Sequence, residues 1–219
     1  MEAREAKSEL FEAIAGLGKA FSSSRRLELI DLLAQSPRSV DQLAEAAGLS
    51  VANTSQHLQA LHASGVVSRC REGNRIRYEL AGDDVLALWI GMRDTAQARV
   101  AEVQRAADRY VGEPVEAISA AELLARLESD ELVLLDVRPG VEFESGHIAG
   151  ARSFPIDELE ERLAQLPHEA EVVAYCRGPF CAFADEAVRT LNRSGRRARR
   201  LEGGWPEWKL AGAPVAGGG

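Results

Sequence analysis

The sequence is poor in cysteine, in histidine and in long apolar runs. Its three cysteines, Cys70, Cys176 and Cys181, are too few for the disulfide framework of a small secreted protein. No stretch approaches the roughly eighteen uncharged apolar residues of a membrane-spanning helix, and the charged start MEAREAKSEL is unlike a signal peptide. We therefore expect a cytoplasmic protein without membrane contact, in which a bridge between Cys176 and Cys181 is transient.

The chain also lacks an excess of positive charge. Its net charge is −8, with 14 Lys and Arg against 15 Asp and Glu up to residue 112, and 12 against 19 beyond it. A chain this acidic cannot hold DNA through its bulk charge, so a DNA contact requires a local basic segment. The run RCREGNRIR at residues 69–77 is such a segment, with four Arg and one Glu.

Residues 24–61 show the pattern of short helices separated by tight turns. Ser39 and Gln42 fit a capping box that opens a helix over Val40–Ala47, and Ser50 fits the cap of the next helix. That helix has an apolar face at spacings of four and three, made of Thr54, Leu58 and Leu61. Its other residues include the polar Asn53, Ser55, Gln56 and Gln59. The arrangement predicts a helix-turn-helix whose second helix enters the major groove of DNA.

A hairpin pattern follows directly. Val66 and Val67 open a strand, residues 72–74 form a turn, and the second strand alternates, with Ile76, Tyr78 and Leu80 expected inward and Arg75 and Arg77 outward. This is the pattern of a cationic wing. Its candidate DNA contacts are Arg69, Arg71, Arg75 and Arg77, and Cys70 is expected to pack beneath the wing.

The segment from Phe21 to Leu80, especially LSVANTSQHLQALHASGVVSRCREGNRIRYEL, resembles the ArsR family of bacterial dimeric repressors. The resemblance implies a mainly α winged helix-turn-helix fold with a β-hairpin wing, and a role in repressing transcription. Departures from that family are informative. Its arsenic and cadmium sensors have a Cys-x-Cys pair where this chain has Ser39, Val40 and Asp41, and its zinc sensors use histidine on the last helix, where residues 83–110 have none. We therefore expect no metal and no cofactor.

Apolar stripes at helical spacing flank this segment on both sides. Residues 83–110 predict one long amphipathic helix with Trp89, Met92, Ala96, Val100, Val103, Ala107 and Tyr110 on one face. Residues 1–21 carry a second stripe of Leu10, Ile14, Leu17 and Phe21. Since a domain of about a hundred residues has little core for both, we predict a homodimer through residues 1–21 and 83–110. Such a dimer places two recognition helices roughly 34 Å apart and implies a near-palindromic operator.

Gly112, Glu113 and Pro114 end this helix and predict a boundary between a DNA-binding and dimerisation domain, 1–112, and a second domain, 113–219.

Helix and strand patterns alternate beyond the boundary. Ser119 and Glu122 fit a second capping box, and buried strands are predicted over Leu132–Val137 and Val172–Tyr175. The alternation predicts an α/β domain with a mainly parallel sheet, in which ligands bind beyond the carboxyl ends of the strands. Cys176 follows one of these ends.

Three ordered segments, LLDVRPGVEFESGHIAGARSFP, VVAYCRGPFC and LEGGWPEWKLAG, resemble the rhodanese family of sulfurtransferases. The resemblance implies that Cys176 carries sulfur as a persulfide, that Asp136 and Arg138 at the neighbouring strand end help to shape the site, and that Gly203, Gly204, Trp205 and Trp208 close the fold. The loop itself comprises Cys176, Arg177, Gly178, Pro179, Phe180 and Cys181. Arg177 can supply positive charge near the sulfur, and Gly178 permits a tight turn.

Typical sulfurtransferases of that family end this loop with Arg, whereas this chain has Cys181, and Pro179 lacks an N–H for an anion. These departures disfavour thiosulfate turnover and favour sulfur exchange between the two cysteines. We interpret the chain as a repressor whose rhodanese-like domain senses or processes reactive sulfur and shifts the helix over 83–110. Alternatives are a sulfurtransferase tethered to a DNA-binding domain, a reductase of arsenate or another oxyanion, and an interaction module with inert cysteines.

Overall fold

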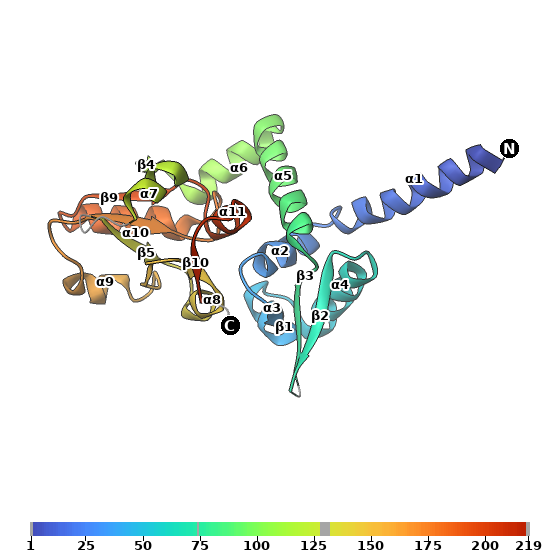
Figure 1. Ribbon diagram of the computed structural model, residues 1–219, viewed down its shortest axis with the longest axis horizontal. Helices are drawn as coiled ribbons and strands as arrows, with labels where there is room; N and C mark the ends of the chain where they lie inside the picture. Colours follow the sequence, from blue (N-terminus) through green and yellow to red (C-terminus); the bar gives the residue numbers. More distant parts are fainter. Residues whose placement is uncertain (1, 74, 128–131, 218–219) are drawn as a thin grey trace. The chain divides into compact units, whose positions relative to one another are not determined.

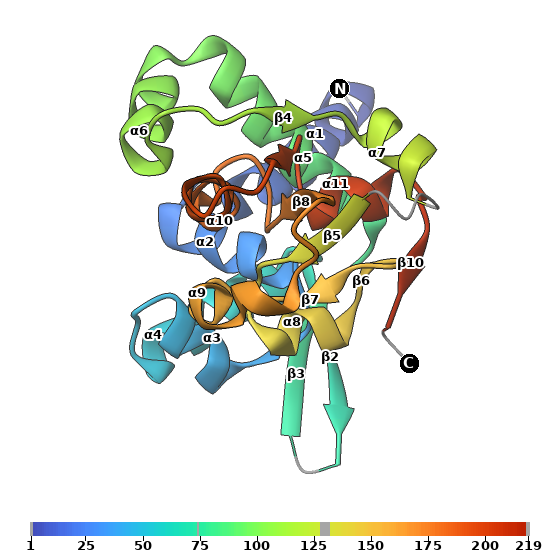
Figure 2. The same cartoon turned by 90° about the vertical axis from the view of Figure 1, so that its left-hand side faces the viewer.

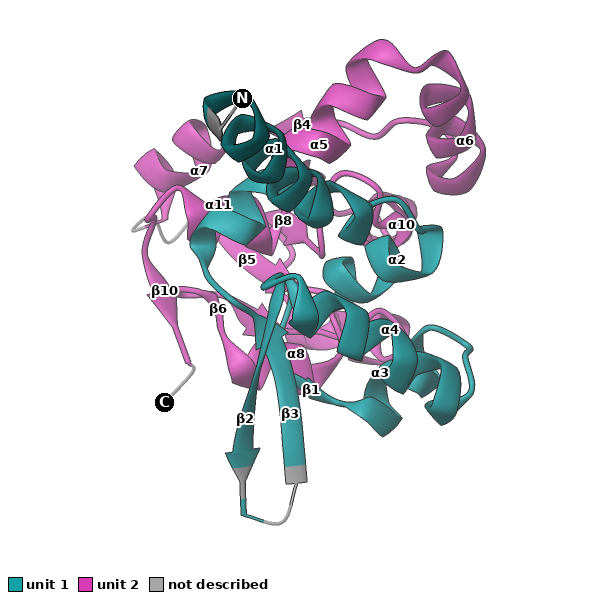
Figure 3. Cartoon of the chain, turned by 90° about the vertical axis from the view of Figure 1, so that its right-hand side faces the viewer, with its two compact units in different colours: residues 1–89 teal, residues 90–219 magenta. Residues whose placement is uncertain are grey.

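The computed structural model describes residues 2–73, 75–127 and 132–217 (Figure 1). The chain divides into two compact units, residues 1–89 and residues 90–219 (Figure 3). The division falls within helix α5 (Asp83–Arg99), which therefore begins in the first unit and ends in the second. The domain boundary expected at residues 112 and 113 lies further along the chain and remains a prediction.

The first unit is a helical domain with a small antiparallel sheet. Three strands in the order β1-β3-β2 form the sheet, and β2 and β3 extend from it as a hairpin (Figure 1). The elements are α1 (Glu2–Ala20), α2 (Ser24–Leu33), β1 (Arg38–Ser39), α3 (Val40–Ala46), α4 (Val51–Ala63), β2 (Val67–Glu72), β3 (Arg75–Leu80) and the start of α5. This confirms the winged helix-turn-helix fold.

Local side-chain bonds explain where α3 and α4 begin. The Ser39 hydroxyl accepts from the N–H of Gln42, whose side chain in turn accepts from the N–H of Ser39, so the predicted capping box is present. Ser50 caps α4 by accepting from the N–H of Asn53 at 3.2 Å. Thr54, Leu58 and Leu61 are fully buried, which confirms the predicted core face of α4.

The helix predicted over residues 83–110 is not continuous. It is α5 followed by α6 (Ala101–Val111), and Val100 between them has extended backbone angles, φ −113° and ψ 101°. The prediction of one long helix is therefore wrong. Its apolar spacing continues through Val100, but spacing reports a shared face and does not require that the backbone between two segments stays helical.

The second unit is an α/β domain. Its main sheet has five parallel strands in the order β4-β9-β8-β5-β7, and β6 pairs with β10 in a separate antiparallel ribbon. Its strands are β4 (Ala117–Ile118), β5 (Leu132–Asp136), β6 (His147–Ile148), β7 (Arg152–Ser153), β8 (Glu171–Tyr175), β9 (Ala198–Leu201) and β10 (Val215–Ala216). Its helices after α6 are α7 (Ala120–Arg126), α8 (Gly140–Ser145), α9 (Leu159–Arg162), a 3-10 turn (Leu163–Gln165), α10 (Ala182–Arg193) and α11 (Trp205–Leu210).

Helices cover both faces of this sheet. Figure 2 shows β8 and β5 between α9 and α10 on one side and α7 and α11 on the other. Successive residues of β8 alternate between two hydrophobic cores, with Val172 and Ala174 packed toward α10, and Val173 and Tyr175 packed toward α7 and α11. A strand buried on both faces is continuously apolar, as β8 is from Val172 to Tyr175. Among the described residues, no helix is long and apolar enough to cross a membrane.

Candidate functional site

The second helix of the helix-turn-helix, α4, presents its polar residues outward. Asn53, Gln56 and Gln59 are exposed, and Ser55 is half-buried. Amide side chains can bond the edges of bases in the major groove, most readily N6 and N7 of adenine. These residues lie on the exposed face of α4, and their contacts with bases remain a prediction.

The arginines of the wing differ in their surroundings. Arg69 and Arg71 are exposed, and Nε of Arg71 donates to the carbonyl oxygen of Gly73 at 3.0 Å. Arg77 is half-buried and donates from Nη2 to the carbonyl oxygen of Pro37 at 2.7 Å, so it ties the wing to the segment before β1. The side chain of Arg75 lies outside the described residues.

Two expectations for the wing are wrong. Ile76 is 50% exposed although it was expected inward, and Cys70 is exposed although it was expected beneath the wing. The reasons are tertiary. Ile76 lies beyond the residues at which β1 pairs with β3, where the hairpin is a two-stranded ribbon, and Cys70 lies opposite Arg77 on β2, which is the edge strand of the sheet. An alternating strand buries one face where a further layer of the protein covers it.

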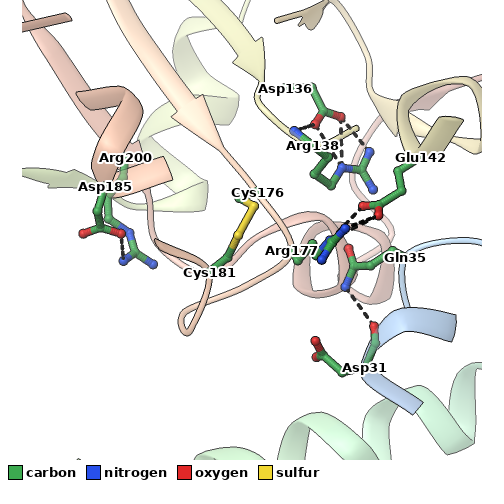
Figure 4. The surroundings of a disulfide bond; sticks show 10 residues. All are labelled: Asp31, Gln35, Asp136, Arg138, Glu142, Cys176, Arg177, Cys181, Asp185 and Arg200. Carbon is green, nitrogen blue, oxygen red and sulfur yellow. Dashed lines mark hydrogen bonds and ion pairs between the residues drawn. A yellow bond between two sulfur atoms is a disulfide. The ribbon is translucent and has the colours of Figure 1, made fainter. Parts of the chain in front are cut away.

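The loop between β8 and α10 holds the two remaining cysteines. The structure joins Cys176 and Cys181 in a disulfide (Figure 4). Cys176 is buried at the end of β8 and belongs to the hydrophobic core on the α10 side, whereas Cys181 is partly exposed and is the N-cap residue of α10. The N–H of Cys181 donates to the carbonyl oxygen of Gly178 at 3.1 Å, which closes the loop upon itself.

The segment before α11 packs directly against this loop. The N–H of Trp205 donates to the carbonyl oxygen of Cys176 at 3.0 Å. A Cβ atom at Gly204 would lie 2.4 Å from the backbone nitrogen of Gly178 and 2.5 Å from the carbonyl oxygen of Cys176. Glycine at 204 is therefore required by the close approach of two backbone segments.

Asp136 and Arg138 form a buried network beside the loop (Figure 4). Arg138 donates from Nη2 to Asp136 at 2.6 Å and to the carbonyl oxygen of Gly146 at 2.7 Å, while the Tyr175 hydroxyl donates to Asp136 at 2.6 Å. Burial, reinforced by the charge of Asp136, raises the pKa of Tyr175 well above its usual range, so the phenol stays protonated. This network fastens the ends of β5 and β8 to the turn at Gly146.

Arg177, the residue after Cys176, points to a buried carboxylate. Its Nη2 lies 2.6 Å from Oε1 of Glu142, which is fully buried on α8 (Figure 4). Arg177 therefore brings an ion pair, and not an isolated positive charge, to the cysteine loop. On the other side of the loop, Asp185 of α10 is buried against Arg200 at 2.9 Å. Burial outweighs the charge of Arg200 and raises the pKa of Asp185 above its usual value.

Two family descriptions match the chain: "Rhodanese-like domain" over residues 119–211 and "Bacterial regulatory protein, arsR family" over residues 23–69. The HTH-type transcriptional regulator Rv0324 of Mycobacterium tuberculosis is 45% identical over 209 residues, which are 95% of this chain and 92% of that protein. The chain is an ArsR-family transcriptional regulator with a rhodanese-like domain.

Each half of this regulator also has relatives of its own. Arsenate reductase 2.2 of Oryza sativa subsp. japonica is 31% identical over 110 residues, which cover 45% of this chain and 85% of that protein. The solution structure of the homodimeric winged helix-turn-helix DNA-binding domain Mb0332 (fragment 1–100) from Mycobacterium bovis is 39% identical, with a TM-score of 0.42, and the match covers 43% of this chain and 87% of that one.

The rhodanese-like domain gathers most of the predicted loop residues at one place. The loop consists of Cys176, Arg177, Gly178, Pro179, Phe180 and Cys181. Asp136 and Arg138 lie at the end of the adjacent strand, and their side chains form an ion pair with each other. The two act as a frame for the loop. Among the described residues of the regulator, no three His, Cys, Asp or Glu side chains are grouped as metal ligands would be.

Sequence reasoning missed the charged residues that hold the loop from outside it. Glu142 lies in the segment LLDVRPGVEFESGHIAGARSFP, of which only Asp136 and Arg138 were assigned to the site, and Asp185, Arg93 and Glu207 were given no role in the site. Arg93 lies in the predicted helix over residues 83–110, where a solvated face is the ordinary interpretation of a charged side chain. The one available signal was the position of Glu142 within the rhodanese-like segment after Asp136.

Proposed function

We propose that this ArsR-family regulator changes its affinity for DNA with the sulfur state of Cys176 and Cys181. The observation that carries the proposal is the pairing of these two cysteines in the loop at the carboxyl end of the parallel sheet. Ligands of such sheets bind at that edge. A cysteine pair on a chain that also holds a DNA-reading helix is suited to converting a thiol reaction into a change in transcription.

The chemistry follows from the two sulfur environments. A persulfide or polysulfide donor transfers its outer sulfur atom to the Cys176 thiolate and leaves as a thiol, which makes Cys176 a persulfide. The Cys181 thiolate then attacks Sγ of Cys176, the bond between the two sulfurs of the persulfide breaks, and hydrosulfide leaves with the electron pair. The product is the Cys176–Cys181 disulfide, which two equivalents of a thiol reduce. Cys181 suits the attacking role because it occupies the N-cap position of α10, and a thiolate is stabilised at the N-terminus of a helix.

Several features disfavour turnover of an oxyanion donor such as thiosulfate in this loop. Pro179 has no N–H, the N–H of Cys181 is bonded within the loop, and Arg177 is paired with Glu142. An anion site of the phosphate-loop type needs inward N–H groups and a cation. Sulfur transfer from a persulfide or a polysulfide, which carries no oxyanion group, does not require such a site.

The DNA end of the proposal is a homodimer on a near-palindromic operator. Helix α1 leaves a stripe of large apolar side chains exposed, namely Leu10, Phe11, Ile14 and Leu17, and none of the described side chains of α6 is buried. Exposed apolar patches of this kind mark protein interfaces. The exposed residues Asn53, Gln56 and Gln59 of α4 supply base contacts in each half-site.

The test is DNA release by inorganic polysulfide. With a duplex selected by the reduced wild-type protein from a random-sequence library, mobility shifts are measured before and after treatment of wild type, Cys176→Ser and Cys70→Ser. We expect release of wild type and of Cys70→Ser, whose thiol lies on the exposed wing, and retention of Cys176→Ser. Equal release of Cys176→Ser and wild type contradicts the proposal.

A second candidate function is a sulfurtransferase or an oxyanion reductase tethered to DNA. The 31% identity to an arsenate reductase over 110 residues favours the second form. Cyanide-dependent turnover of thiosulfate tests the first, and thiol consumption that depends on arsenate and on Cys176 tests the second. Mass spectrometry of Cys176 and Cys181 after each donor separates stoichiometric sensing from turnover.

A further inference from the structure

Helix α5 carries contacts of both units within one helical turn. In the first unit, Nε1 of Trp89 donates to Oδ1 of Asp31 on α2 at 3.3 Å. In the second unit, Nη2 of Arg93 lies 2.6 Å from Oε1 of Glu207 on α11. Residues four apart lie on the same side of a helix, and the helix between them is stiff. A displacement of Arg93 is therefore transmitted to Trp89.

Arg93 is also in contact with the cysteine loop. A Cβ atom at Gly178 would lie 3.3 Å from Nη1 of Arg93 and 3.7 Å from Oε1 of Glu207, so the ion pair covers the loop backbone between the two cysteines. Arg93 is buried, with 6% of its side chain exposed, whereas helix surfaces usually leave arginine in water. The buried position of Arg93 therefore depends on the conformation of the loop and on the position of Glu207.

Glu207 is connected to Cys176 through the backbone. It lies in the first turn of α11, two residues after Trp205, whose N–H bonds the carbonyl oxygen of Cys176. The carboxylate also lies against Gly203, where a Cβ atom would meet the Cβ and Cγ atoms of Glu207 at 3.2 Å. A change in the conformation of the cysteine loop therefore displaces both Arg93 and Glu207.

A cavity next to the cysteine loop leaves room for the loop to change its conformation. A cavity of about 530 Å³ separates its tip from α5 and α6. Pro179 and Phe180 line the cavity from the loop, and Gln97, Gln104 and Asp108 line it from the two helices. When the bond between Cys176 and Cys181 opens, the loop loses its covalent constraint and its tip can enter this space.

We propose that Arg93 couples the cysteine loop to the DNA-binding unit: the loop in its bridged form holds the Arg93–Glu207 pair, and opening of the bridge repositions this pair and, with it, α5. Arg93 is a positioning residue that takes no part in the sulfur chemistry. The inference rests on the proposed function and adds the element that transmits its signal, namely the stretch of α5 from Trp89 to Arg93.

The test measures DNA affinity of the full chain by fluorescence anisotropy in two states, reduced by a phosphine and treated with inorganic polysulfide. For wild type we expect the affinity to differ by about 10-fold between the states, within the usual range of allosteric coupling. For Arg93→Ala we expect a difference below about 2-fold, with the same sulfur species at Cys176 and Cys181 by mass spectrometry. Arg162→Ala, which breaks the pair of Arg162 on α9 with Glu158, is the matched control and should respond like wild type.

Rescue separates coupling from a general structural role. Arg93→Glu combined with Glu207→Arg keeps an ion pair at the same place, and we expect it to restore most of the wild-type difference, whereas Glu207→Gln alone should lose it. If Arg93→Ala does not fold, Arg93→Lys and Glu207→Gln carry the same test, since lysine cannot bond Glu207 and Asp94 through a planar fork.

Two results overturn the inference in distinguishable ways. If wild type and Arg93→Ala lose DNA affinity equally on treatment, Arg93 does not couple the sites, although the proposed function stands. If the cysteines of wild type react but its DNA affinity stays the same in both states, the proposed function and the inference are both wrong.

Discussion

The cysteine loop and the DNA-reading surface are built in opposite ways. Around the loop, Asp136, Glu142 and Asp185 are all buried, and each has an arginine within 3 Å. On the reading surface, Asn53, Gln56 and Gln59 are exposed on α4, and Arg69 and Arg71 are exposed on the wing. The loop is positioned by the protein interior before any ligand arrives, whereas the polar groups of the predicted reading surface are left in solvent, where we propose that DNA bonds them.

This difference predicts which property a substitution in each region should change, the stability of the fold or the binding of DNA. Changing a residue near the loop removes one member of a buried pair, so it should lower the stability of the fold as well as alter the chemistry. Changing a residue on the reading surface should alter DNA binding at nearly constant stability, because surface substitutions have small effects on folding.

The largest expected effect is at the centre of the buried network. Asp136→Ala leaves the guanidinium of Arg138 buried without its carboxylate, and we expect the free energy of unfolding to fall by about 3–5 kcal/mol, as for other broken buried pairs. Chemical denaturation measures it. The control is Glu28→Ala, which breaks an exposed pair with Arg25 and should cost less than about 1 kcal/mol. Equal costs would show that the loop surroundings are no more preorganised than the surface.

Gly204→Ala tests the close approach of the loop and the segment before α11. The added Cβ overlaps the backbone of Gly178 and Cys176, neither of which can turn aside as a side chain would, so we expect destabilisation of about 3 kcal/mol. Gly140→Ala is the matched control because a Cβ there meets nothing within 4 Å. Thermal unfolding of both variants gives the comparison, and similar midpoints for the two would contradict the observed packing.

Glu171 in β8 provides a pH-dependent test. Burial acts to raise its pKa, but hydrogen bonds from Arg199 and Arg126 outweigh burial and hold the pKa below the usual value of 4.5. A lowered pKa in the folded state means that the stabilisation is present above the unfolded-state pKa and is lost as the pH falls through the folded-state pKa. Glu171→Gln should therefore cost about 2 kcal/mol at pH 7 and progressively less in acid. Denaturation midpoints of both proteins from pH 7 to pH 3 check this, and a constant difference over that range is the opposing result.

On the reading surface the expected effects are smaller and confined to DNA. Gln56→Ala should cost about 1–2 kcal/mol of discrimination at one base position in each half-site. Arg71→Ala should weaken binding to all sequences and reduce the salt slope by about 1. Binding titrations at several salt concentrations measure both. Unchanged base preference in the first variant or an unchanged slope in the second would remove that residue from the DNA interface.

Cys70→Ser should have the smallest effect of the set. The thiol is exposed on β2, the edge strand of the small sheet, so we expect the free energy of unfolding to change by less than about 0.5 kcal/mol. A large loss of stability would show that the wing is covered in solution, for example by a partner subunit.

Local patterns were predicted well where the local sequence determines the structure. The capping residues Ser39 and Ser50 and the buried face of α4 are as expected, since caps and helical spacing depend on residues within one or two turns. Ser119 also caps α7, but the carboxylate of Glu122 pairs with Arg199. A residue far along the chain can thus take the carboxylate that would otherwise complete a capping box.

The sequence by itself determined the two fold types, the buried face of α4, and the placement of Cys176 at the carboxyl end of a parallel strand. All of these follow from periodicity, capping and the order of strands and helices. Only the tertiary structure decided the break at Val100, the exposure of Ile76 and Cys70, and the partners of Arg177 and Arg93. These depend on which surfaces meet after folding. Glu142 lies 35 residues before Arg177, and Glu207 lies on a helix more than a hundred residues beyond Arg93. No local pattern records a contact over such distances.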